Sequence, residues 1–284
     1  MSDNSPRSAD RKFALIAPVV VGLVAVVVLV LLLTRQPPPP PTPAPVVAEA
    51  PPLVAAPPAP TQPAAATRTD LIAAAARASD AYAAGAKDGS GRDLVGRRFR
   101  VRLTFGCGGP AGDPGSAQAY YQYDRAGSAL RLVARPAVWT ELPLVRAAPT
   151  PSGTESVEGF WLPRPWLTSE GCPTRRTVAP PATPTPVEAP TLGLAMLHAA
   201  EASRVERRGQ RPYEHVIKLA PENLDQAPTF GLVLEGKVSG FADGAAIHCW
   251  SESAEHRPVC LYAVDIDRVA FEDAKATVLA DWPR

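Results

Sequence analysis

The sequence lacks the short motifs by which common enzyme classes are recognised. It contains no G-x-S-x-G, S-x-x-K, G-x-G-x-x-G or P-loop pattern, so a nucleophile elbow, a dinucleotide-binding turn and a phosphate-binding loop are not indicated. Its four histidines, His198, His215, His248 and His256, do not have the H-x-x-x-H spacing of a zinc site. We therefore predict no catalytic residue, no metal site and no cofactor, although a triad assembled from distant positions leaves no local motif.

The chain also lacks an excess of charge of either sign. Its formal net charge is +1, and residues 67–284 hold equal numbers of basic and acidic side chains. Proteins that bind nucleic acid in general do so by neutralising phosphates with clustered Lys and Arg. A nucleic-acid partner is therefore not expected.

Long apolar runs are absent with one exception, residues 13–34. This segment holds no charged residue, and Thr34 is its only polar side chain. A helix of this length spans about 33 Å, because each residue adds about 1.5 Å, and a bilayer core is roughly 30 Å thick. Buried helices of soluble proteins are rarely so long and so uniformly apolar. We predict a transmembrane helix over 13–34.

Basic residues flank the predicted span unequally. Arg7, Arg11 and Lys12 precede it, whereas Arg35 alone follows closely. The positive-inside bias places residues 1–12 in the cytoplasm and 35–284 outside it. A cleaved signal peptide would have a shorter apolar region with a small-x-small cleavage site soon after it, so we favour a retained anchor. The expected location is the bacterial inner membrane, single-pass, with the C-terminal domain in the periplasm.

Residues 35–66 form a predicted proline-rich linker. Thirteen of the 31 residues from 36 to 66 are proline, and proline both fixes φ and removes an amide donor. A polyproline-II-like spacer of this length reaches on the order of 90 Å. A ligand for an SH3-like groove is the alternative, but such ligands usually carry a flanking Arg or Lys. The linker is expected to hold the following domain away from the membrane.

Cysteine is scarce, with four residues at positions 107, 172, 249 and 260. No C-x-x-C pair occurs, which argues against a zinc site or a redox-active pair. An even number of cysteines in an oxidising compartment indicates disulfides. Of the three possible pairings we favour Cys249–Cys260, because the two flanking segments resemble facing strands of a hairpin. Cys107–Cys172 is then the second disulfide.

The extracytoplasmic part is predicted to be an α+β domain of predominantly antiparallel strands. We expect an α+β subdomain over 67–178, a proline-rich loop over 179–190 and a β-rich subdomain over 191–284. The loop either divides two subdomains or lies on the surface of one. A helix is expected to start at Thr69-Asp70 and to stop at Gly85. Alternating apolar residues predict strands over 97–105, 119–123, 130–132, 138–145, 157–162, 192–196, 213–219, 230–238, 245–250, 259–264 and 269–271. Leu194, Leu197 and Val205 also fit a helix, but we favour the strand over 192–196.

Two groups of residues are candidate ligand contacts. Arg98, Arg100 and Arg102 share one face of the strand over 97–105, where they either pair with carboxylates of neighbouring strands or bind an anionic glycan, lipid head group or acidic protein. Trp161 and Trp166 flank two prolines and an arginine. Such an aromatic and proline-rich run either fills the edge of a core or contacts a glycan or peptide.

These observations favour a membrane-anchored binding or scaffolding module of the cell envelope. They fit a non-enzyme better than an enzyme. Its expected partners are the membrane itself and an envelope protein or glycan. The alternative is an envelope hydrolase acting on cell-wall or lipid substrates, which would require His215 or His248 to meet a serine and a carboxylate. In a third hypothesis, the domain stabilises a membrane complex through the span.

Overall fold

The computed structural model describes residues 64–86, 91–113, 115, 117–174, 189–201, 206–209, 211–218 and 228–284. All of them belong to one compact unit, Thr61–Arg284. The predicted tail 1–12, the predicted span 13–34 and nearly all of the linker 35–66 lie outside the described residues, as does most of the loop 179–190. Across the described ranges, no helix is both long enough and apolar enough to cross a membrane.

Helix α2, Arg68–Ala83, opens the described part of the chain. Its N-cap is Thr67, whose side chain forms a capping box with Asp70, so the helix starts slightly earlier than predicted because the cap is Thr67 rather than Thr69. Gly85 follows the helix with φ of +66°, a conformation that suits glycine at a helix end. The buried face consists mainly of alanines and Leu71, which allows close packing against the strands.

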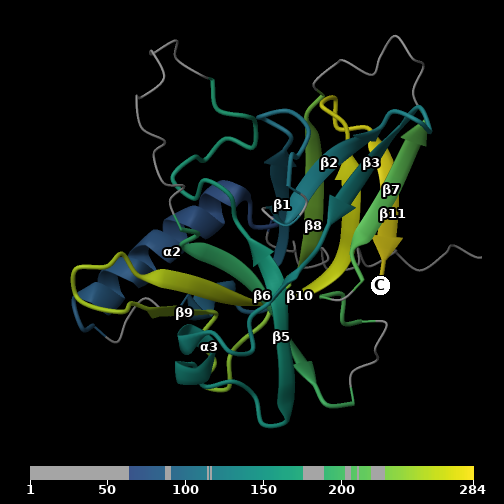
Figure 1. Ribbon diagram of the computed structural model, residues 1–284. Coiled ribbons are helices and arrows are strands. Elements are labelled where there is room, and N and C mark those ends of the chain that lie inside the picture. Colours follow the sequence, from purple (N-terminus) through teal and green to yellow (C-terminus); the bar gives the residue numbers. More distant parts are fainter. Residues whose placement is uncertain are drawn as a thin grey trace, which may run out of the picture. The chain divides into compact units, whose positions relative to one another are not determined.

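Eleven strands make up most of the described domain (Figure 1). In chain order they are β1 (Arg98–Phe105), β2 (Ala119–Asp124), β3 (Ala129–Ala134), β4 (Ala137–Val138), β5 (Thr154–Trp161), β6 (Leu192–Ala199), β7 (Tyr213–Lys218), β8 (Phe230–Val238), β9 (Ile247–Trp250), β10 (Val259–Glu272) and β11 (Val278–Pro283). Two short helices, η1 (Arg92–Leu94) and α3 (Pro143–Ala147), complete the set. The domain is therefore β-rich with few helices, as predicted.

Strand β10 joins two parts of one eight-stranded sheet, whose order is β1-β8-β10-β6-β5-β4 with β9 and β11 also paired to β10. The first residues of β10 pair with β6 and β9, and its later residues pair with β8 and β11. Figure 1 shows this strand crossing from the β6 and β9 region to the β8 and β11 region. The β6–β10 pair is parallel and the other pairs are antiparallel, so the sheet is mixed rather than wholly antiparallel.

The core lies on both faces of this sheet. On one face, α2 covers the strands, and the Tyr262 hydroxyl donates to the Leu71 carbonyl oxygen at 2.7 Å. The second sheet, β2-β3-β7, packs through aromatic rings, with Tyr121 and Phe230 centroids 5.5 Å apart. On the other face, Leu261 joins a smaller cluster around Trp139 and α3. Neighbouring residues of β10 thus point to opposite faces, as strand geometry requires.

Several predicted elements need correction. The strand expected over 138–145 ends at Val138, and Pro143 instead begins helix α3, because proline is well suited to the first turn of a helix. The strands expected over 259–264 and 269–271 are one strand, β10, interrupted by a register shift between Ile266 and Arg268. Strand β11 was not predicted.

Both predicted disulfides are present. Cys249 and Cys260 are directly opposed in the β9–β10 hairpin, as expected from the flanking sequences. Cys107–Cys172 links the turn after β1 to the segment that follows β5. No free cysteine occurs among the described residues.

Candidate functional site

The arginine stripe of β1 lies on one face of the sheet, and each arginine has an acidic partner. Arg98 pairs with Asp267 of β10. Arg100 contacts Glu235 of β8 at 3.1 Å and Glu272 of β10 at 2.8 Å. Arg102 lies 3.4 Å from the same Glu272 carboxylate. This arrangement matches the interpretation as cross-strand ion pairs, and recognition of an external anion by the stripe stays a prediction.

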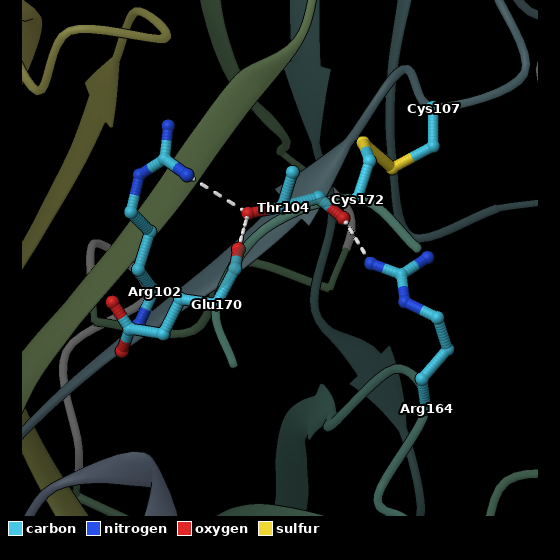
Figure 2. Close-up of a disulfide and its surroundings, with 6 residues drawn as sticks. All are labelled: Arg102, Thr104, Cys107, Arg164, Glu170 and Cys172. Carbon is cyan, nitrogen blue, oxygen red and sulfur yellow. Dashed lines mark hydrogen bonds between the residues drawn. A yellow bond between two sulfur atoms is a disulfide. The ribbon is translucent and has the colours of Figure 1, made fainter. Parts of the chain in front are cut away.

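The free edge of β1 is covered by polar groups from two other segments. Ala66 bonds the first part of the edge through the Arg98 carbonyl and the Arg100 amide. Further along, the Arg102 amide donates to Glu170 Oε1 at 3.1 Å, and the Thr104 hydroxyl donates to the Glu170 carbonyl (Figure 2). Uncovered strand edges invite pairing with other chains. Here the segment around Glu170 occupies that edge without forming a strand.

Arg68 fixes the segment that follows β5. This residue of the first turn of α2 is only 3% exposed. Its guanidinium donates to three backbone carbonyl oxygens, those of Pro163, Arg164 and Leu167, at 2.6–2.9 Å. Burial lowers the pKa of Arg68, and the nearby Arg164 charge lowers it further. A sequence-distant side chain therefore holds in place the loop that carries Trp166.

The disulfide Cys107–Cys172 closes the other end of this loop. Gly106 comes just before it with φ of +79°, and a Cβ there would lie 2.7 Å from the Tyr121 ring. Glycine is thus required both for the backbone conformation and for the close approach of the ring. Figure 2 shows the disulfide above Thr104, with the Arg164 guanidinium directed at the Thr104 carbonyl oxygen. The loop is anchored at both ends.

A cavity of about 500 Å³ opens between this loop and the end of β1. Both tryptophans predicted as ligand contacts line it, and Trp166 is 58% exposed. The remaining walls are mostly apolar and are formed by Leu103, Phe105, Phe160, Leu162, Leu232, Ala117, Ala119, Ala189 and by prolines 163, 165 and 190. A second cavity of about 470 Å³, beside α2, shares Pro165 and Trp166 with the first. Trp166 is therefore part of both.

Few polar groups reach the first cavity. Gln118 is one, but its amide is occupied by β5: it donates to the Gly159 carbonyl at 3.1 Å and accepts from the Trp161 amide at 2.7 Å. Arg164 is another, and it donates to the Thr104 carbonyl at 2.8 Å. Its φ of +53° is rare for a residue with a side chain. Such strained positions are often found at ligand clamps.

The histidines named for a hydrolase lie elsewhere. His248 contacts Asp243 at 3.2 Å, and His215 is on β7. The Ser253 hydroxyl lies 2.8 Å from His256 Nδ1 on the surface. None of these residues lines the first cavity.

Sequence reasoning missed Arg68, Arg164 and Gln118 as parts of the site. The Pro-Arg-Pro-Trp sequence around Arg164 drew attention to the tryptophan alone. The position of an arginine between two prolines could also have marked Arg164 as a candidate. The hydrogen-bond partners of Arg68 and Gln118 lie 41 or more positions away in the sequence, so nothing in the local sequence marks these two residues. Arg98, Arg100 and Arg102 do not line the cavity, although the Arg102 side chain donates to Thr104, which does.

The fold and the cavity define a β-rich, disulfide-bonded domain with one largely apolar site beside an anchored loop. Comparison of the chain with protein families, with curated proteins and with solved structures finds no match.

Proposed function

We propose that this chain is a ligand-binding or scaffolding module of the bacterial cell envelope, with the cavity at Trp161 and Trp166 as its binding site. Residues 13–34 anchor it in the inner membrane as a single span with a cytoplasmic N-terminus. Residues 35–66 space the domain away from the bilayer in the periplasm. The paired disulfides support this placement, because disulfides persist in oxidising compartments.

The observation that carries the binding role is the cavity itself. Its volume of about 500 Å³ falls within the roughly 300–1,000 Å³ typical of small-molecule sites. Apolar walls with a few placed polar groups are also typical of such sites. The loop that forms one wall is held by Arg68 and by Cys107–Cys172, so the site exists before a ligand arrives and binding costs little ordering entropy.

A neutral fluorescent probe tests this role. We expect the full chain in phospholipid nanodiscs to bind N-phenyl-1-naphthylamine above the background of empty nanodiscs, and Trp166→Ala to weaken binding about tenfold. Val216→Ala is the matched control, since Val216 is similarly exposed and does not line the cavity. Equal probe binding by both variants, or none by the wild type, contradicts the proposal.

The topology has its own test. Alkaline phosphatase fused after Arg284 should be active in the periplasm, and the intact chain should fractionate with inner membranes. A fusion active only in the cytosol contradicts the proposed placement.

A further inference from the structure

We infer that the cavity takes a single-chain amphiphile bearing one anionic head group, a carboxylate or a phosphate, which is held by the Arg164 guanidinium. This inference rests on the proposed binding role of the cavity and goes on to name the chemical class of the ligand. It follows from three features: the apolar walls, the charge on the lining and the incomplete bonding of Arg164.

Among the described residues that line the cavity, Arg164 is the one with a full charge, and no Asp or Glu accompanies it. Its described hydrogen bond goes to a neutral carbonyl oxygen, that of Thr104. Its Nε atom is buried and has no hydrogen-bond partner in the described part of the chain. A buried donor without a partner is destabilising, and because the Nε atom is buried, a ligand in the cavity would meet the outer nitrogens of the guanidinium.

Arg164 has another cation, Arg68, as a neighbour. Arg68 lies close by, and its three bonds go to neutral carbonyl oxygens, while the Glu170 carboxylate partly offsets its charge. Glu170 is the neighbouring carboxylate, and its Oε1 is engaged by the Arg102 amide. Burial lowers the pKa of Arg164, as expected for a desolvated cation without a counterion. An anion at the cavity would supply the missing negative charge.

The walls define the rest of the ligand. Leu103, Phe105 and Leu162 present hydrocarbon and aromatic surface that favours an acyl chain, because burial of apolar surface drives such binding. A guanidinium presents a fork of donors that matches a carboxylate or a phosphate. A neutral amphiphile would fill the walls but leave the charge unpaired, and a cationic amphiphile would be repelled. Glycans need many polar partners, which these walls do not offer.

A series of eight-carbon amphiphiles tests the head-group preference with the full chain in nanodiscs. Displacement of N-phenyl-1-naphthylamine is measured with octanoate, 1-octanol, octyltrimethylammonium and octyl phosphate. We expect octanoate and octyl phosphate each to bind about tenfold more tightly than octanol, with octyltrimethylammonium weakest.

Variants assign that preference to Arg164. Arg164→Gln should bind octanoate about tenfold more weakly and octanol unchanged, whereas Arg164→Lys should retain part of the preference. Arg146→Gln is the control, because it removes one exposed positive charge outside the cavity. Near-ultraviolet circular dichroism checks that each variant is folded, and the wild-type ligand series is decisive if a variant is not.

The outcomes separate this inference from the function on which it rests. Equal affinity for octanoate and octanol overturns the anionic ligand while leaving an apolar binding site. Failure of every ligand, and of the probe, overturns both the inference and the binding role.

Discussion

Arg68 shows how one buried side chain organises a site without lining it. Its guanidinium replaces the water that three loop carbonyls would otherwise bind. Arg68→Met keeps much of the side-chain volume but leaves these acceptors without a donor, each at a cost of roughly 1–3 kcal/mol if it stays buried.

We expect Arg68→Met to lower the free energy of unfolding by about 3 kcal/mol and to weaken probe binding at the cavity. Urea unfolding and probe titration measure the two effects. Arg77→Met, a helix position with an exposed side chain, is the control and should change neither. A stable Arg68→Met variant with unchanged probe binding would show that the loop needs no clamp.

His198 of β6 is a buried histidine. It is 4% exposed, and its Nε2 atom has no hydrogen-bond partner in the described part of the chain. Burial lowers its pKa, partly opposed by the Glu158 and Glu206 carboxylates, while Arg284 and Arg207 lower it further.

Because the unfolded chain binds a proton at His198 more readily than the folded chain, stability should fall as pH drops below about 6.5, the ordinary histidine value. We expect a lower urea midpoint at pH 5 than at pH 7.5, and a smaller difference in His198→Asn. Carboxylates with lowered pKa titrate below this window. An unchanged pH dependence in His198→Asn would assign the effect to another group.

At the scale of elements, the face of β1, β8 and β10 that carries ion pairs contains both exposed pairs and a buried carboxylate. The Arg98–Asp267 pair is exposed on both sides, whereas Glu272 is 4% exposed between Arg100 and Arg102. Exposed pairs contribute little to stability. Removal of one partner of a buried pair leaves a desolvated charge.

Glu272→Gln should therefore cost on the order of 3 kcal/mol, and Asp267→Asn should have little effect. Urea unfolding at low and high salt distinguishes them, since salt screens the exposed pair more strongly. Similar losses in the two variants would mean that burial does not set the strength of these pairs.

The two disulfides should stabilise the domain unequally. Cys107–Cys172 closes a loop of 65 residues and Cys249–Cys260 one of 11. The chain-entropy relation gives about 4 kcal/mol for the first and about 3 kcal/mol for the second. We expect Cys107→Ala/Cys172→Ala to lower the urea midpoint more than Cys249→Ala/Cys260→Ala. The reverse order would indicate that packing in the hairpin outweighs loop closure.

At the scale of the whole molecule, local patterns predicted the strands better than their arrangement. Strand β8 matches its predicted bounds of 230–238, because its apolar alternation is intact and turn residues flank it. The parallel pairing of β6 with β10 depends on contacts between residues nearly 70 positions apart, which no local pattern encodes. Trp161 and Trp166 lie close together in the sequence, so a local pattern could identify them as candidates. The cavity that they share, and the role of Arg68 in anchoring its loop, depend on contacts between distant residues and could not be predicted.

The shared strand β10 has a consequence for the integrity of the chain. Strand β1 pairs with β8 and β5 pairs with β6, so each side of segment 179–190 supplies strands to the same sheet. Each disulfide, by contrast, lies wholly on one side of that segment. A protease site inserted there should therefore give two polypeptides that elute together in native buffer and separate in urea without any reductant. The domain would then survive as a two-piece complementation pair, a format in which either half can be labelled or replaced on its own.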